Sequence, residues 1–173
     1  PGFYSKQVCF AFGDQKLFCM YDHEKRSYIR IYNFKDLLTG VEKGVCAGAD
    51  VKEIQEIQGS KDYLFTTAVW GPRNKSLIIA TNNGRVIYYD LESSQILYEE
   101  IVHTAEIYSL TLTNDYTMLL TGSKDGNCKL LHPETFEMIR TFNYGKPCRT
   151  AVISPLYEDP KHQKFHLVCA GGQ

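Results

Sequence analysis

Two histidine-containing groups in this sequence have residue types and spacing that could carry out chemistry. His103 and Asp125 could form an acid–base pair, because a carboxylate can hold an imidazole in one tautomer. His162 and His166 have the i, i+4 spacing of a helical metal-binding pair. However, Pro160 precedes that second pair in a polar loop, and His166 begins a strand-like run. Without a helix to align the two imidazoles, we expect no metal site and no cofactor.

The elements that would position His103 and Asp125 belong to an internal repeat. Residues 67–96 align with residues 109–138 at an offset of 42, without a gap. In that alignment the Asn-Gly pair at 83–84 falls on the Asp-Gly pair at 125–126. Both dipeptides favour tight β-hairpins because they tolerate positive φ angles. Each unit contains four short runs bounded by turn residues, which is the pattern of one four-stranded propeller blade.

Weaker copies of the repeat flank these two units. The strands that we expect lie at about residues 8–12, 17–21, 27–34, 51–57, 65–70, 77–81, 85–90, 95–101, 107–112, 117–122, 127–132, 137–142, 150–155 and 166–172. Residues 52–57 could also form a short helix, but an outer strand fits so short a run better. The segment from Thr39 to Asp50 is expected to be a polar connection.

The predicted fold is therefore all-β: a partial WD-repeat β-propeller of about three and a half four-stranded blades over residues 1–173. The expected blades span about residues 3–57, 61–102, 103–144 and 145–173. Because propellers close with about four to eight blades, this number predicts a longer parent chain with a seven-bladed ring. The alternative is that two copies together complete such a ring.

Composition excludes several functional classes. The formal net charge is −1 and the basic residues are scattered, so we expect no direct binding of nucleic acid. No apolar stretch is long enough to cross a bilayer, so we expect no membrane partner. The six cysteines contain no C-x-x-C pair, and we expect reduced thiols in a cytoplasmic protein. Four of them lie in apolar runs and are expected to behave as small buried residues: Cys9, Cys19, Cys128 and Cys169.

The repeat at about residues 103–144 resembles the signature of WD-repeat blades. This signature combines a His, a Ser or Thr, an Asp and a Trp. His103, Thr121 and Asp125 fall at the first three positions, and Leu131 replaces the Trp. In the repeat at about residues 61–102 the signature is largely absent. We expect the three polar residues to form a buried structural network, because no nucleophile stands beside them in the pattern.

More specific motifs resemble one WD-repeat family, the i subunit of eukaryotic translation initiation factor three. The motifs that carry this resemblance are residues 67–72 (TAVWGP), 115–129 with its SKDG hairpin, 135–137 and 141–142 on an outer strand, 150–155 (TAVISP) and 170–173 (AGGQ). The resemblance covers about residues 60–173, and the first sixty residues match only loosely.

The resemblance implies a non-catalytic scaffold subunit that binds the b and g subunits of the same factor and, through them, the small ribosomal subunit. The alternatives are another WD-repeat scaffold, such as a ubiquitin-ligase adaptor or a signalling platform, and a propeller enzyme. The strands expected to line the channel are apolar and small, which disfavours an enzyme. Direct RNA binding is disfavoured by the balanced charge.

Propeller loops offer a surface for protein partners. The connections between first and second strands, and between third and fourth strands, should emerge on one face. The residues predicted to bind protein on that face are Arg73, Asp90, Asp115, Tyr116 and His132.

Overall fold

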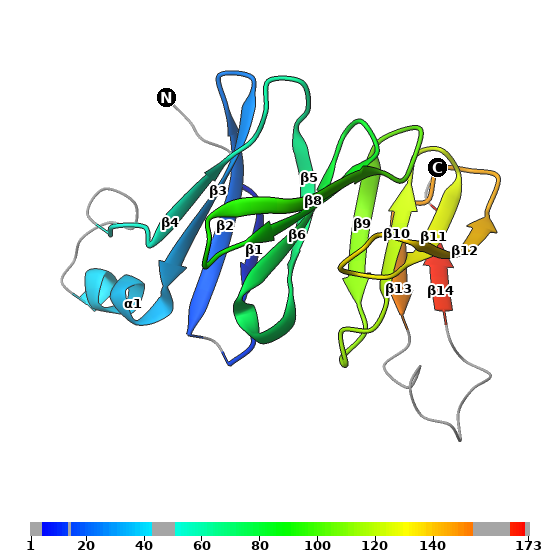
Figure 1. The fold of residues 1–173 in the computed structure, drawn as a ribbon. Coiled ribbons are helices and arrows are strands. Elements are labelled where there is room, and N and C mark those ends of the chain that lie inside the picture. Colours follow the sequence, from blue (N-terminus) through cyan, green and yellow to red (C-terminus); the bar gives the residue numbers. More distant parts are fainter. Residues whose placement is uncertain (1–4, 14, 43–50, 154–166, 172–173) are drawn as a thin grey trace. The chain divides into compact units, whose positions relative to one another are not determined.

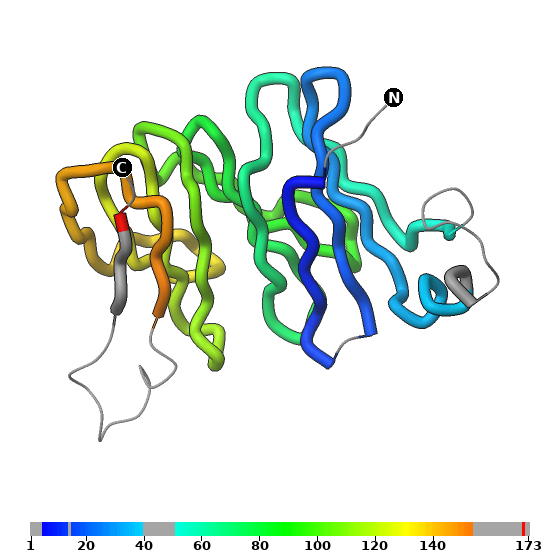
Figure 2. The backbone as a smooth tube through the Cα atoms, turned by 180° about the vertical axis from the view of Figure 1, so that it is seen from behind, coloured from blue at the N-terminus to red at the C-terminus, as the bar shows by residue number. Residues whose placement is uncertain are grey.

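The computed structural model describes residues 5–13, 15–42, 51–153 and 167–171. The chain divides into two compact units, residues 1–65 and residues 66–173. Each unit is built from antiparallel sheets in which consecutive strands lie side by side (Figure 1). Figure 2 lets the reader follow the same chain path within each unit from the opposite side.

The first unit contains one four-stranded sheet in the order β1-β2-β3-β4, with a helix between the last two strands. Its elements are β1 (Ser5–Phe10), β2 (Lys16–His23), β3 (Arg26–Asn33), α1 (Phe34–Glu42) and β4 (Gln55–Gln58). Along β3, alternate residues such as Ser27, Ile29 and Ile31 are buried, as expected for a strand with one face on the core.

The second unit contains two four-stranded sheets and a two-stranded sheet. The first sheet consists of β5 (Phe65–Trp70), β6 (Ser76–Thr81), β7 (Arg85–Asp90) and β8 (Gln95–Ile101), with a short 3₁₀ helix η1 (Pro72–Asn74) after β5. The second consists of β9 (Ile107–Leu112), β10 (Leu119–Ser123), β11 (Asn127–Leu131) and β12 (Met138–Asn143). The third pairs β13 (Thr150–Ile153) with β14 (Leu167–Ala170). These sheets confirm the predicted fold class, an all-β partial WD-repeat propeller.

Two parts of the strand prediction were wrong. Helix α1 occupies positions where a strand end and a polar connection were expected. Asp36 in its first turn favours the helix N-terminus and accepts a hydrogen bond from the side-chain Nδ2 of Asn33 at 3.1 Å. The strand expected over 51–57 is shorter and lies later, as β4. Its ladder with β3 joins residues 55–58 to residues 28–31, so the strand begins only where β3 offers partners.

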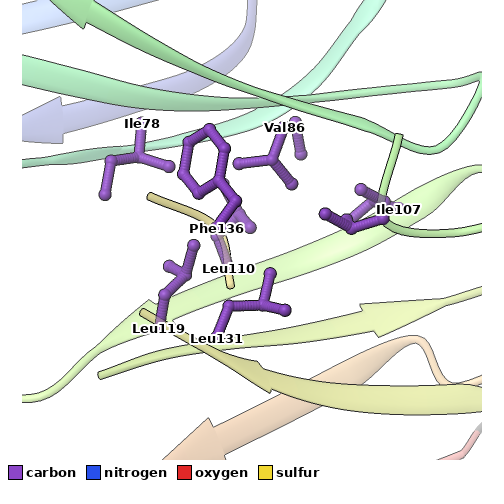
Figure 3. Packing of buried hydrophobic residues seen from close by; sticks show 9 residues of the cluster. Ile78, Val86, Ile107, Leu110, Leu119, Leu131 and Phe136 are labelled. Carbon is purple, nitrogen blue, oxygen red and sulfur yellow. The ribbon is translucent and has the colours of Figure 1, made fainter. Parts of the chain in front are cut away.

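The two four-stranded sheets of the second unit share a buried core. Ile78 and Val86 from the first sheet pack in one cluster with Ile107, Leu119 and Phe136 from the second (Figure 3). Burying apolar side chains of this size is worth about 1.5–3 kcal/mol each. The two sheets are therefore held face to face by hydrophobic contact.

The sequence repeat also recurs in the backbone. The amides of Val102 and His103 donate to the carbonyl of Gly84 at 2.9 and 3.0 Å. Forty-two positions later, the amides of Tyr144 and Gly145 donate to the carbonyl of Gly126 at 2.8 and 3.2 Å. In both sheets, the chain that leaves the fourth strand is thus bonded to the hairpin between the second and third strands.

The close approach of the His103 carbonyl to Gly84 predicts different costs for alanine at Gly84 and at Gly126. Gly84 and Gly126 have nearly equal φ angles of +85° and +87°, but a Cβ at Gly84 would overlap the His103 carbonyl oxygen. At Gly126 the nearest atom to a Cβ, the Lys146 amide nitrogen, is 3.3 Å away. Gly126→Ala should therefore cost mainly the left-handed conformation, about 1–2 kcal/mol. Gly84→Ala should cost at least about 1 kcal/mol more.

Urea unfolding of the two variants and the parent chain measures this difference. Equal losses of stability in the two variants would contradict the close approach at Gly84.

Candidate functional site

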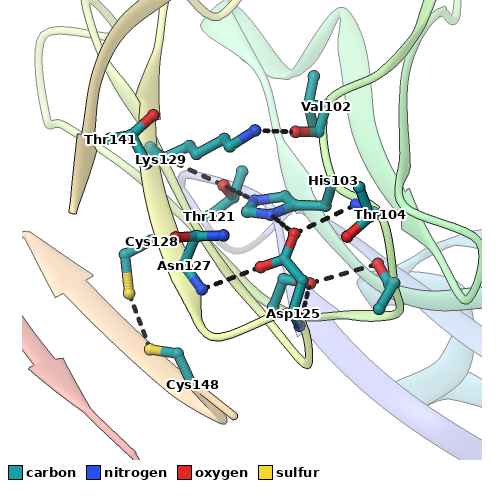
Figure 4. A network of polar contacts seen from close by, with 12 residues as sticks. Val102, His103, Thr104, Thr121, Asp125, Asn127, Cys128, Lys129, Thr141 and Cys148 are labelled. Carbon is teal, nitrogen blue, oxygen red and sulfur yellow. Dashed lines mark hydrogen bonds and ion pairs between the residues drawn. The ribbon is translucent and has the colours of Figure 1, made fainter. Parts of the chain in front are cut away.

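A buried polar group of the second unit centres on His103 (Figure 4). This residue follows β8, and its imidazole is buried beside the hairpin between β10 and β11. Its Nδ1 lies 2.8 Å from Oδ2 of Asp125, and its Nε2 lies 2.7 Å from Oγ1 of Thr121. The structure thus brings together the three residues that the WD-repeat signature predicted to form a network.

The hydrogen-bond partners determine the tautomer of this imidazole. An ionised Asp125 only accepts, so Nδ1 of His103 carries the hydrogen, and Nε2 receives the hydroxyl hydrogen of Thr121. Oδ2 of Asp125 also accepts from the amide of Thr104 at 3.1 Å, and Oδ1 accepts from the amide of Asn127 at 2.9 Å. Each polar atom of the group has a partner, as buried polar atoms require.

Burial and hydrogen bonding displace the pKa values of both ionisable groups downward. Burial lowers the pKa of His103, and this outweighs the opposite influence of Asp125. For Asp125, burial alone would raise the pKa, but hydrogen bonds from the Asn127 amide, from His103 and from the Thr104 amide lower it on balance. The folded chain therefore holds a neutral imidazole beside an ionised carboxylate.

This arrangement ties two segments of backbone together and does not present a proton to a substrate. The side chain of His103 is 0% exposed and that of Asp125 is 7% exposed. A general base must come within hydrogen-bond reach of the atom from which it takes a proton. Both imidazole nitrogens of His103 are already bonded within the chain. The geometry supports the structural role that the sequence predicted.

The preceding sheet uses a smaller group at its hairpin. The hydroxyl of Thr81 donates to Oδ1 of Asn83 at 2.7 Å and accepts from the amide of Arg85 at 2.9 Å. These bonds stay within the turn between β6 and β7. The sequence of this sheet, β5–β8, matches the WD-repeat signature only weakly. This agrees with hydrogen bonds that brace the local turn and do not reach the segment before β5.

The first unit contains a polar network that the sequence motifs did not identify. Ser27 donates to Asp22 at 2.6 Å and accepts from the amide of Phe65 at 2.8 Å. Lys6 forms an ion pair with Asp22 at 2.5 Å and donates to the carbonyl of Phe65 at 3.0 Å. The signal available in the sequence is Asp22, near the end of the second strand and before its hairpin.

Of the five residues predicted to bind protein, four lie in connections between strands of the second unit and Asp90 is the last residue of a strand. Arg73 is exposed in η1, and Asp90 ends β7. Asp115 and Tyr116 lie between β9 and β10, and His132 follows β11. Within each sheet these connections emerge at the same end, because first-to-second and third-to-fourth turns of an antiparallel meander do so. We call these five residues the loop face.

Three polar side chains of the loop face form hydrogen bonds within their own turns, and for His132 the Thr135 amide donates to Nδ1 at 3.4 Å. Asp90 accepts from the hydroxyl and the amide of Ser93 at 2.6 and 2.7 Å, and these bonds lower the pKa of Asp90. Asp115 accepts from the hydroxyl of Thr113 at 2.7 Å and from the amide of Thr117 at 2.9 Å. Hydrogen bonds within the turn therefore brace each of these loop-face side chains.

An ion pair joins two of these turns, and its basic partner was not among the predicted residues. Nζ of Lys75, just after η1, lies 2.7 Å from Oε1 of Glu92 in the turn after β7. The Lys75 carbonyl also accepts from the amide of Leu91 at 2.9 Å. The backbone bond fixes the spacing of the two connections, and the exposed ion pair adds little to stability.

Other chemistry is limited in the part of the chain that the structure describes. Among those residues, no group of three or more His, Cys, Asp or Glu side chains is placed to hold a metal ion. His162 and His166 lie outside the described residues. No described helix is long and apolar enough to cross a membrane.

Removing the hydroxyl of Thr121 should lower the stability of the folded chain, because it leaves the hydrogen-bond network of His103 incomplete. Thr121→Val keeps the side-chain volume but leaves Nε2 of the buried His103 without its donor, which should cost about 1–3 kcal/mol. Thr141→Val, at an exposed position of β12, should change stability by less than about 0.5 kcal/mol. Urea unfolding of both variants tests this, and equal effects would contradict it.

The lowered pKa of His103 predicts a loss of stability in mild acid. Below about pH 6.5, the ordinary pKa of histidine, the unfolded chain gains a proton that the folded chain does not accept. Stability should therefore fall from about pH 7.5 to pH 5.5. His103→Gln should show a weaker fall, whereas His132→Gln, which removes an exposed imidazole, should behave like the parent chain.

Denaturant midpoints across this range measure the slope for each variant. A slope in His103→Gln as steep as that of the parent would show that the buried imidazole is not responsible. The contribution of Asp125 has a separate window, because its depressed pKa removes stability only below about pH 4.

Comparison with known proteins places this arrangement of sheets in a family. No protein-family model matches the chain. Curated proteins named eukaryotic translation initiation factor 3 subunit I, from Danio rerio, Homo sapiens and Mus musculus, are each 30% identical to it over 132 residues. The aligned stretch is 72% of this chain and 38% of each relative, so the chain spans well under half the length of these relatives. This confirms the resemblance that the blade motifs indicated, and over that stretch the chain is a homologue of eukaryotic translation initiation factor 3 subunit I.

Proposed function

We propose that this chain is a non-catalytic, protein-binding part of translation initiation factor 3, and that its loop face contacts the b and g subunits. Homology to subunit I supports the assignment to this factor. The observation that supports binding through the loops is the bracing of Asp90, Asp115 and His132 by their own turns. The cytoplasm is the compartment in which the chain would act, and contact with the small ribosomal subunit would be indirect.

Braced turns suit protein binding because ordering a flexible loop on association costs free energy. The Asp115 carboxylate accepts two hydrogen bonds through Oδ1 from Thr113 and the Thr117 amide, which fixes the direction of its charge. Tyr116 follows it with a φ of +60° and is half-buried. Tyrosine is one of the residue types enriched among those that contribute most of the binding energy at protein interfaces.

The second candidate function is that of another WD-repeat scaffold, such as a ubiquitin-ligase adaptor or a signalling platform. The same braced loops would serve any protein partner. The experiment below separates the two, because only the first requires the b and g subunits.

Two substitutions in the turn after β9 test the loop face. Asp115→Asn removes the charge but keeps an oxygen for the Thr117 amide, and Tyr116→Asn removes the ring but tolerates a positive φ. Each should weaken binding of purified b or g subunit by about tenfold or more, which corresponds to about 1.4 kcal/mol. Glu100→Gln, on the exposed outer strand β8, removes a charge elsewhere and should leave binding unchanged.

Titration calorimetry with each subunit gives the dissociation constants, and thermal unfolding confirms that the variants are folded. Binding of both subunits by the parent chain, with no effect of either substitution, would place the contact elsewhere on the chain. Failure of the parent chain to bind either subunit would favour the second candidate function.

A further inference from the structure

Two buried cysteines far apart in the sequence meet in the second unit. The sulfur atoms of Cys128 and Cys148 are 2.8 Å apart, and both residues are 0% exposed (Figure 4). Neither forms a disulfide bond in the structure. Their proximity was not apparent from the sequence, because 20 positions separate them and no C-x-x-C pair is present.

The pair joins two successive repeats. Cys128 lies in β11, at the centre of the second four-stranded sheet, and its ladder partner there is Phe142 in β12. Cys148 lies in the segment between β12 and β13, where its amide donates to the carbonyl of Ser123 at 2.9 Å. Both cysteines belong to one buried cluster with Ala151 of β13. A covalent bond between them would fasten the segment that enters β13 to the preceding sheet.

The preceding repeat shows what packing alone requires at these positions. In the repeat alignment, Cys128 corresponds to Val86 at an offset of 42, and Cys148 corresponds to Ile107 at an offset of 41. Val86 and Ile107 are both buried in the core shown in Figure 3. An apolar pair is therefore sufficient for packing at the same two positions of a repeat. Two thiols add a chemistry that the packing does not need.

We propose that Cys128 and Cys148 are a disulfide-forming modification site, and that the bond clamps the β13 segment to the β9–β12 sheet under oxidising conditions. A disulfide requires the sulfurs to approach to about 2.05 Å, a small movement from their present separation. The bond closes a loop of moderate length, so it should restrict the unfolded chain and stabilise the folded one.

The oxidant in this proposal is a small-molecule disulfide, and the reaction is two successive exchanges. The thiolate of Cys148 attacks one sulfur of the small disulfide, forming a mixed disulfide and releasing one small thiol. The thiol of Cys128 then gives up its proton and attacks Cys148, forming the protein disulfide and releasing the second small thiol. The cysteine pair loses two electrons and two protons, and the small disulfide gains them.

Burial determines which part of the chain must open for the first exchange. Lys146, Pro147 and Arg149, which flank Cys148, are exposed. Opening this segment breaks the hydrogen bond from Cys148 to Ser123 and the cation–π contact of Arg149 with Tyr108, where the guanidinium lies 5.1 Å from the ring centre. Cys148 itself is fully buried, so this segment must open locally before the oxidant can reach its sulfur.

Treatment of the native chain with oxidised glutathione tests the proposal. Mass spectrometry of a non-reduced digest should show one peptide pair linked through Cys128 and Cys148, with the loss of two hydrogen masses. The midpoint of thermal unfolding should rise by about 5–10 °C, and a reducing agent should reverse both changes. The Cys128→Val variant should instead retain one glutathione on Cys148.

The matched control is the double variant Cys128→Val and Cys148→Ile, which reproduces the apolar pair of the preceding repeat. Its unfolding midpoint should not respond to oxidised glutathione. If the larger side chains prevent folding, Cys128→Ala with Cys148→Ala serves the same purpose. A mixed disulfide that never closes, a link that uses a different cysteine, or closure without a rise in the midpoint would each overturn the proposal. These readouts do not depend on binding of any factor subunit.

Discussion

The second unit depends on one backbone constraint, the hydrogen bonds that return the chain from each fourth strand to the hairpin of the same sheet. The carbonyls of Gly84 and Gly126 each accept two amide hydrogen bonds from the segment that leaves the sheet. This contact sets where the next first strand begins, and it therefore places β9 and β13. Ile107 of β9 packs with Leu119 of β10 in the hydrophobic cluster that joins the two sheets.

Different polar groups secure comparable hairpins in the three four-stranded sheets. The sheet of β9–β12 uses a buried imidazole between a carboxylate and a hydroxyl, whereas the sheet of β5–β8 uses one threonine hydroxyl. In the first unit Ser27 and Lys6 bind the backbone of Phe65 directly. The shared requirement is that buried polar atoms find partners, and side chains of several types can meet it. This explains how a blade can lose its sequence signature and keep its strands.

The sequence predicted features that repeat and features that arise from local chemistry. Strand positions in the two central units followed from the 42-residue offset, and the network of His103 followed from its spacing to Asp125. Helix α1 was missed because nine residues provide few turns in which to recognise a helical period. The pairing of Cys128 with Cys148 and the network of Lys6 depend on how separate strands meet, and no single-sequence motif records such contacts. The loop-face positions were expected correctly as turns, but their internal bracing by Ser93 and Thr113 became visible only in three dimensions.

The bracing of the loops within their own turns has a consequence for how this surface can change over generations. Asp90 accepts from Ser93, and Asp115 accepts from Thr113 and Thr117, so each carboxylate braces the turn in which it lies. Energetic effects at such separated sites add with little coupling. Substitutions at these two carboxylates can therefore accumulate largely separately, while the glycine-centred backbone contacts keep the strands in place.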